Sequence, residues 1–214
     1  MKIGPAIFVP DGKTAPCALR RRICWRHLCR VTKLLVILSW IFIAVPRSNA
    51  QQPKANEFQV KAAYLYNFGR FVEWPDQNAS DKSQPFEICV LGADPFGPTL
   101  DAVLASGSIA GKSVAAKRIS RPQDINSCRI LFISSSEEGH LKEVLAALDK
   151  TSVLTVSDIP RFSERGGMIG FILDGNRVRF DVNLASAQGA RLTLSSELLK
   201  VATNVRKDSH TGDF

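Results

Sequence analysis

Residues 86–92 read FEICVLG, a short apolar run that ends in glycine, and residues 129–134 read RILFIS, a second run of the same kind. Uninterrupted apolar runs of this length are typical of strands that a parallel sheet buries on both faces. Helical patterns separate such runs along the chain, and strands that alternate with helices indicate an α/β domain. We therefore expect a single three-layer α/β/α domain whose sheet is mostly parallel.

The other elements follow from periodicity and turn residues. Apolar residues recur at spacings of three and four in residues 56–74, which predicts a helix that ends at Trp74-Pro75. Two runs at 168–173 and 177–182 flank Asp174-Gly175-Asn176, which predicts a C-terminal antiparallel hairpin. Further strands are expected at 112–119 and 152–156, and further helices at 95–104, 138–148 and 183–188. A last helix, capped by Ser195 or Ser196, should carry Leu198, Leu199, Val201, Ala202 and Val205.

The excess positive charge of the chain is confined to its first fifty residues. The full sequence has a formal net charge of +8, whereas residues 51–214 hold 19 basic and 19 acidic residues. A nucleic-acid-binding domain needs a basic face on its folded part. The charge distribution therefore argues against a nucleic-acid partner.

The same fifty residues have the layout of an export signal. A basic stretch over residues 20–33 precedes the apolar run LLVILSWIFIAV at 34–45, and Ser48-Asn49-Ala50 has the small residues of a cleavage site. Twelve helical residues reach only about 18 Å, short of the roughly 30 Å hydrocarbon core, which leaves an uncleaved anchor as the lesser alternative. We predict a secretory signal peptide at residues 1–50, cleaved after Ala50, and one domain at residues 51–214.

Export would leave two of the five cysteines, Cys89 and Cys128. Two cysteines in an oxidising compartment are a candidate disulfide. Such a bond would close a loop of about 40 residues and stabilise the domain by roughly 3–4 kcal/mol. Two free, buried thiols are the alternative.

No catalytic, metal or cofactor motif emerges from residues 51–214. The two histidines there, His140 and His210, have no metal-ligand spacing to the cysteines, and the chain contains neither a G-x-S-x-G nor a G-x-G-x-x-G motif. We therefore expect no metal and no cofactor, and a binding or regulatory module rather than an enzyme. A hydrolase centred on residues 134–136 and His140 is a further alternative.

Two places are candidates for a ligand pocket or a partner surface. Ligands of open α/β sheets bind beyond the carboxyl ends of the strands, where the sequence places Gly92, Ser134 and Ser135. A helix cap formed by Ser135 with Glu138 explains the serines equally well. The second place combines apolar side chains with glycines, for which core packing and left-handed backbone are the alternatives. Its residues are Phe162, Gly166, Gly167 and Met168.

Blocks spread over residues 57–205 resemble a known family. They are VKAAYLYNF at 60–68 with FVEWP at 71–75, ICVLG at 88–92, CRILFIS at 128–134, VLTVSD at 153–158, GGMI at 166–169, RVRFDVN at 177–183 and SSELL at 195–199. Their order and spacing are similar to those of the YfiR family of periplasmic proteins.

The resemblance implies a function that the composition does not show. YfiR-like proteins have no known catalytic activity, and the best understood members repress a membrane-bound diguanylate cyclase by binding its periplasmic sensor domain. An outer-membrane, peptidoglycan-binding lipoprotein relieves that repression. The output is the level of cyclic di-GMP and hence biofilm formation. Members of the family can form homodimers. A small-molecule-binding sensory component, which serves a histidine kinase or receptor from the strand ends near Gly92 and Ser134, is the alternative.

The resemblance also bears on the cysteines. Cys89 and Cys128 fall where the family places a disulfide. Some members have a second cysteine pair near the glycine segment, where this chain has Ser163 and Gly170. Redox control through a second disulfide is therefore in doubt for this chain.

Overall fold

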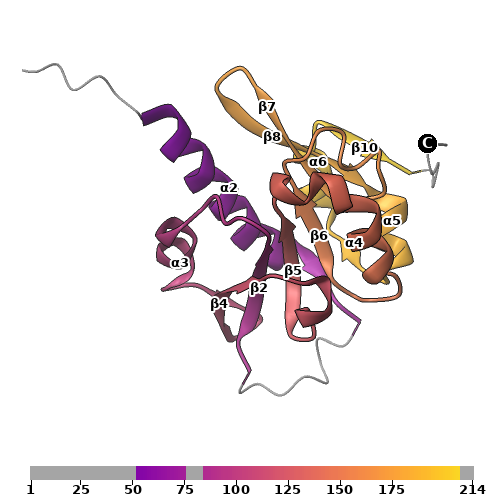
Figure 1. The fold of residues 1–214 in the computed structure, drawn as a ribbon, viewed down its shortest axis with the longest axis horizontal. Helices are drawn as coiled ribbons and strands as arrows, with labels where there is room; N and C mark the ends of the chain where they lie inside the picture. The colour runs from indigo at the N-terminus through magenta and orange to yellow at the C-terminus, as the bar shows by residue number, and fades with distance from the viewer. Residues whose placement is uncertain (1–51, 76–83, 208–214) are drawn as a thin grey trace, which may run out of the picture. The chain divides into compact units, whose positions relative to one another are not determined.

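The computed structural model describes residues 52–75 and 84–207 (Figure 1). The predicted signal peptide and His210 lie outside the described residues, so the expected cleavage after Ala50 stays a prediction. None of the described helices combines the length and the apolar character that crossing a bilayer requires.

One eight-stranded, mostly parallel sheet forms the centre of the domain, as the sequence predicts. Its strand order is β10-β8-β7-β6-β5-β2-β4-β3, and only the pairs β7–β8 and β3–β4 are antiparallel. The strands are β2 (Phe86–Leu91), β3 (Ser108–Ile109), β4 (Lys112–Ile119), β5 (Cys128–Ile133), β6 (Leu154–Ser157), β7 (Ile169–Asp174), β8 (Arg177–Asn183) and β10 (Asn204–Arg206).

Helices cover both faces of the sheet, because the central strands are apolar on both sides. Successive side chains of a strand point to opposite faces. In β2, Ile88 and Val90 therefore pack beneath α2 (Gln52–Phe71) and α3 (Pro98–Leu104). Cys89 and Leu91 pack in the second core, beneath α4 (Leu141–Ala147). Figure 1 shows β2, β5 and β6 between these two helical layers, which confirms the three-layer α/β/α arrangement.

The remaining helical segments are short. They are η1 (Pro122–Asp124), η2 (Ser135–His140), α4 (Leu141–Ala147), α5 (Leu184–Gly189) and α6 (Ser196–Val201). The helix expected at 95–104 begins three residues later, after Gly97 takes a φ of 52°. The helix expected at 138–148 is divided into the 3-10 segment η2 and the α-helix α4.

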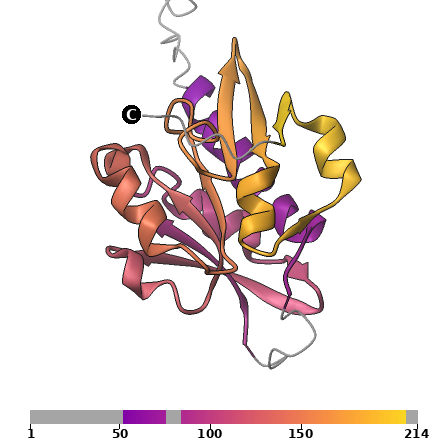
Figure 2. The same cartoon turned by 90° about the vertical axis from the view of Figure 1, so that its right-hand side faces the viewer.

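The structure corrects two predicted helix ends, and in both cases backbone pairing replaces helix. The first helix stops at Phe71, because β1 (Val72–Glu73) pairs antiparallel with β9 (Thr193–Leu194) in a small second sheet. The last helix stops at Val201, and the Thr203 N–H donates to the Phe180 carbonyl as the chain turns into β10 beside β8. An edge strand presents unpaired backbone groups, and β10 satisfies those of β8. Figure 2 shows this C-terminal segment beside the hairpin.

A disulfide links the two central strands. Cys89 in β2 and Cys128 at the start of β5 are bonded to one another, with their Cα atoms 5.8 Å apart. Both cysteines are buried in the core beneath α4. The disulfide implied by the family resemblance is therefore present in the structure, in place of two free thiols.

Removing this bond should destabilise the domain without changing its fold. The bond joins residues 39 positions apart, and a loop of that size corresponds to about 3–4 kcal/mol in the chain-entropy account. We expect Cys89→Ala/Cys128→Ala to lose about that much unfolding free energy in urea titrations. Reductant should destabilise the wild-type protein similarly and leave the double variant unchanged. Equal stability of reduced and oxidised wild-type protein would contradict this expectation.

Candidate functional site

The structure brings the predicted residues Gly92, Ser134 and Ser135 to the carboxyl edge of the sheet. Leu91 ends β2 directly beside Ile119 of β4 and Ile133 of β5. The Ala93 N–H donates to the Ser136 Oγ at 3.0 Å, which ties the turn after β2 to the turn after β5. Sequence reasoning thus placed these turns at one edge correctly.

Little open space remains between those two turns. Gly92 has a φ of 86°, and a Cβ there would come within 2.6 Å of the Glu137 Oε1. Glycine is therefore required by its backbone conformation and by the close approach of that side chain. The polar groups at this edge are turned toward one another, and a ligand at Gly92 and Ser134 stays a prediction.

Ser134, rather than Ser135, caps the helical segment that follows β5. The Ser134 side chain accepts a hydrogen bond from the Ser136 N–H, and Ser135 is the first residue of η2. His140 lies exposed at the end of η2 and makes no hydrogen bond to these serines within the described part of the chain. The hydrolase alternative therefore lacks the serine–histidine contact that such chemistry requires.

A charge cluster that the sequence did not predict lies at the same carboxyl edge of the sheet. Arg118 of β4 donates to Asp94 at 2.9 Å, to both carboxylate oxygens of Asp101 and to the Gly97 carbonyl. Hydrogen bonds from Arg118 lower the pKa of Asp101, and the same bonds raise the pKa of the guanidinium. The acids lie 24 and 17 positions before Arg118, one in the turn after β2 and one in α3, so no local sequence pattern signals the cluster. The cluster holds the segment between β2 and α3 against the end of β4.

Lys61 forms a second cluster that sequence reasoning missed. Its ammonium lies 2.6 Å from Glu57 and 2.8 Å from Asp158, and 4.8 Å from the centre of the Phe58 ring. Lys61 is only 4% exposed. A buried ammonium is tolerated when it is paired in this way. The spacing of Glu57 and Lys61, four residues on one helix, was the available signal, and the cluster holds α2 against the turn after β6.

The segment between β6 and β7 contains the second set of predicted site residues. Phe162 and Met168 are 1% and 8% exposed, so core packing accounts for them. Gly166 has a φ of 97°, and a Cβ at Gly167 would overlap the Phe162 ring. Backbone conformation and close packing thus explain why glycine occupies both positions, and a partner surface here stays a prediction.

A hydrogen-bonded link occupies the place where some family members have a second cysteine pair. The buried Ser163 hydroxyl donates to Asp181 at 2.6 Å, and the Asn183 side-chain amide donates to the Ser163 carbonyl at 2.8 Å. A Cβ at Gly170 would lie 2.6 Å from the Asp181 Oδ1. This chain therefore joins the segment to β8 through hydrogen bonds rather than through sulfur.

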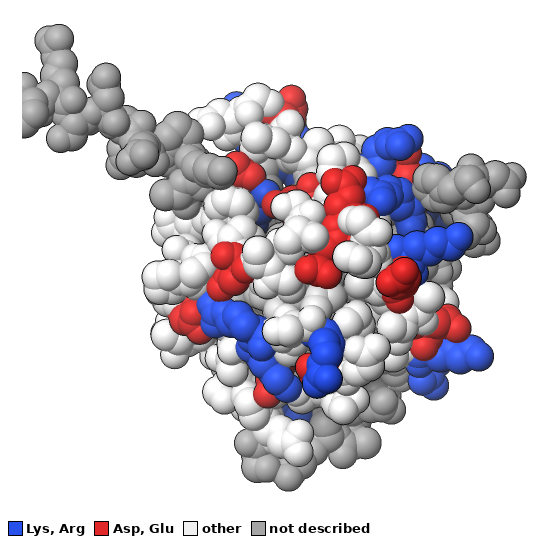
Figure 3. All heavy atoms as spheres, viewed as in Figure 1, with Lys and Arg blue, Asp and Glu red and all other residues white. Residues whose placement is uncertain are grey.

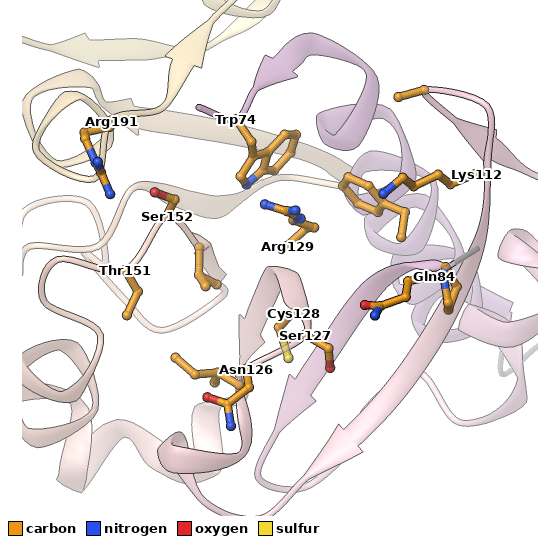
Figure 4. A pocket seen from close by; sticks show the side chains of 15 residues that line it. Trp74, Gln84, Lys112, Asn126, Ser127, Cys128, Arg129, Thr151, Ser152 and Arg191 are labelled. Atoms are coloured by element: carbon orange, nitrogen blue, oxygen red, sulfur yellow. The ribbon is translucent and has the colours of Figure 1, made fainter. Parts of the chain in front are cut away.

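A cavity of about 430 Å³ lies at the opposite edge, where the parallel strands begin (Figure 4). Its walls come from the starts of β2, β4, β5 and β6 and from the segments beside the small sheet β1–β9. Sequence reasoning missed this cavity, because its walls come from segments that lie far apart in the chain. Its lining residues are Trp74, Gln84, Pro85, Phe86, Ala110, Lys112, Ile125, Asn126, Ser127, Cys128, Arg129, Thr151, Ser152, Val153 and Arg191.

The fold and these clusters define a disulfide-linked α/β domain in which Arg118 and Lys61 at the carboxyl edge are paired with carboxylates. The profile of YfiR/HmsC-like proteins matches residues 58–203. The chain therefore belongs to the YfiR/HmsC-like family, as its sequence blocks predict. That family is periplasmic, regulatory rather than catalytic, and acts with membrane signalling proteins.

Arg118 should stabilise the domain in a pH-dependent way. Because the folded-state pKa of Asp101 lies below its ordinary 3.8, the pair stabilises the protein above that pH and loses its effect as the pH falls through the lowered pKa. We expect Arg118→Ala to lower the unfolding free energy by about 1 kcal/mol at neutral pH, allowing for solvent screening. The difference should shrink below about pH 3.5. Arg121→Ala, which removes the exposed pair with Asp124, is the matched control and should change little. A pH-independent loss in Arg118→Ala would contradict the assignment.

Gly167 should tolerate no side chain. The Phe162 ring fills the space that a Cβ would need, and overpacking of this kind costs about 1–3 kcal/mol. We expect Gly167→Ala to unfold at lower urea concentration, whereas Gly139→Ala, with open space around its Cβ, should behave like the wild type. Equal stability of the two variants would show that the segment can shift to make room.

Proposed function

We propose that this chain is an exported regulator that represses an inner-membrane diguanylate cyclase by binding its periplasmic sensor domain, and thereby lowers cyclic di-GMP. The observation that carries the proposal is the family match, which spans residues 58–203 and so nearly the whole described domain. An outer-membrane, peptidoglycan-binding lipoprotein is the proposed relieving partner, and a homodimer is a proposed state of the free protein. Both come from the family resemblance.

The periplasmic location has two further supports. Residues 1–50 have the order of a signal peptide, with basic, apolar and small-residue segments in turn. The Cys89–Cys128 disulfide is the kind of bond that persists in an oxidising compartment.

The proposed role as a regulator rather than an enzyme fits the polar groups of the described residues. Lys61, Arg118, Ser134 and Ser163 each have a partner within the fold. These groups stabilise the structure, and none is left as an activated nucleophile or base. On the face seen in Figure 3, acidic and basic side chains are interspersed, which fits a protein partner better than a nucleic acid.

The cavity at the amino edge favours a second candidate function. Its volume of about 430 Å³ lies within the range of small-molecule sites. A periplasmic small-molecule-binding component that serves a histidine kinase or receptor would use such a cavity.

Deletion of the gene tests the proposed repression. We expect cyclic di-GMP and biofilm to rise several-fold, because the cyclase would lose its repressor. The full chain should restore the low level, and a chain lacking residues 2–50 should not, because it stays in the cytoplasm. Affinity capture of the tagged, exported protein should recover a membrane diguanylate cyclase, and deletion of that cyclase should abolish the rise. Unchanged cyclic di-GMP together with capture of a histidine kinase would favour the second candidate instead.

A further inference from the structure

We propose that the cavity at the amino edge of the sheet binds a small organic anion, whose carboxylate or phosphate is held by Arg129, Arg191 and the indole N–H of Trp74. The inference concerns a ligand of the domain itself and does not depend on the identity of the signalling partner.

The first observation is a buried donor without an acceptor. Trp74 is 4% exposed, and its Nε1 has no hydrogen-bond partner among the described residues. An indole N–H can only donate, so the missing partner is an acceptor. Figure 4 shows the nitrogen edge of the ring turned toward Arg129 and Ser152, into the cavity.

The second observation is the sign of the charge around the cavity. Lys112, Arg129 and Arg191 all line it, and no aspartate or glutamate is among the described residues of its lining. In the described part of the chain, neither arginine side chain has an ion pair or a hydrogen bond, in contrast to Arg118 at the opposite edge, which is fully paired. The two guanidinium groups repel a cation and attract an anion.

The guanidinium groups also define the shape of the anion. Arginine presents parallel N–H donors that match the two oxygens of a carboxylate or phosphate. Arg129 lies on the main sheet and Arg191 two residues before β9, so the two approach the cavity from different elements (Figure 4). In Figure 4 the Ser152 hydroxyl lies between Arg191 and Trp74 and offers a further donor.

One part of the cavity wall is apolar and accommodates the body of the ligand; Pro85, Phe86, Ile125 and Val153 contribute to it. Gln84, Asn126, Ser127 and Thr151 make another part of the wall polar. A volume of about 430 Å³ exceeds what a bare inorganic ion needs and suits a small molecule that has one anionic group and an apolar or aromatic body.

The protein contains its own reporter for this site. Of the three tryptophans, Trp25 and Trp40 belong to the predicted signal peptide, so Trp74 is the only tryptophan of the exported form. Intrinsic fluorescence of protein purified from the periplasm therefore follows the cavity directly. The probes are phenyl phosphate and benzoate, with benzamide as the uncharged match to benzoate.

We expect at least one of the two anions to change the Trp74 fluorescence saturably, and benzamide to bind about tenfold more weakly or not at all. The better anion identifies the head group. Arg129→Gln and Arg191→Gln should each weaken binding about tenfold or more, as measured by fluorescence and calorimetry. Arg179→Gln, which removes an exposed ion pair with Asp174 on the hairpin, is the matched control and should bind normally.

Three results would overturn the proposal: no binding of either anion, equal binding of benzamide, or unchanged affinity in both arginine variants. Thermal unfolding shows whether each variant folds. If one does not, we measure instead whether inorganic sulfate displaces the bound anion from the wild-type protein. A lack of displacement counts against the site. Because no cyclase enters the assay, its outcome is separate from that of the deletion experiment.

Discussion

The two-sided burial of β2 and β5 is the constraint on which the rest of the structure depends. Every residue of β2 except Glu87 is buried, so the strand needs a cover on each face. The long helix α2 with α3 provides one, and α4 provides the other. The disulfide then fixes the pair of strands to one another within the second core. With both faces occupied, only the edges of the sheet remain for interactions with other molecules.

The two edges differ in how their polar groups are satisfied. At the carboxyl edge, Arg118 pairs with Asp94 and Asp101, and Lys61 pairs with Glu57 and Asp158, which fastens α3 and α2 to the sheet. At the amino edge, donors from Trp74, Arg129 and Arg191 surround a cavity whose described lining residues include no acid. In many parallel sheets ligands bind at the carboxyl end. Here the groups at that end are already used to hold the fold together.

The sequence predicted those parts of the fold that rest on local pattern. The apolar runs at 86–91 and 129–134, the hairpin around Gly175 and the order of helices all follow from periodicity and turn chemistry. The short strands β1, β9 and β10 were missed, because two or three residues show no period and their pairing depends on distant backbone. Likewise, the Lys61–Asp158 and Arg118–Asp101 contacts join residues 97 and 17 positions apart, and the cavity at the amino edge is lined by segments from all along the domain.

The position of the cavity bears on how a protein without visible catalytic groups could transmit a signal. A ligand shifts an equilibrium only if it binds two states differently. The main sheet offers little freedom near Arg129, since the disulfide holds β5 to β2 one residue away. The small sheet is separate from the main sheet. Trp74 follows β1 directly, and Arg191 lies just before β9. An anion held by all three residues would therefore tie the small sheet to the main sheet, and the surface around β1 and β9 is the part of the domain whose conformation would depend on the ligand.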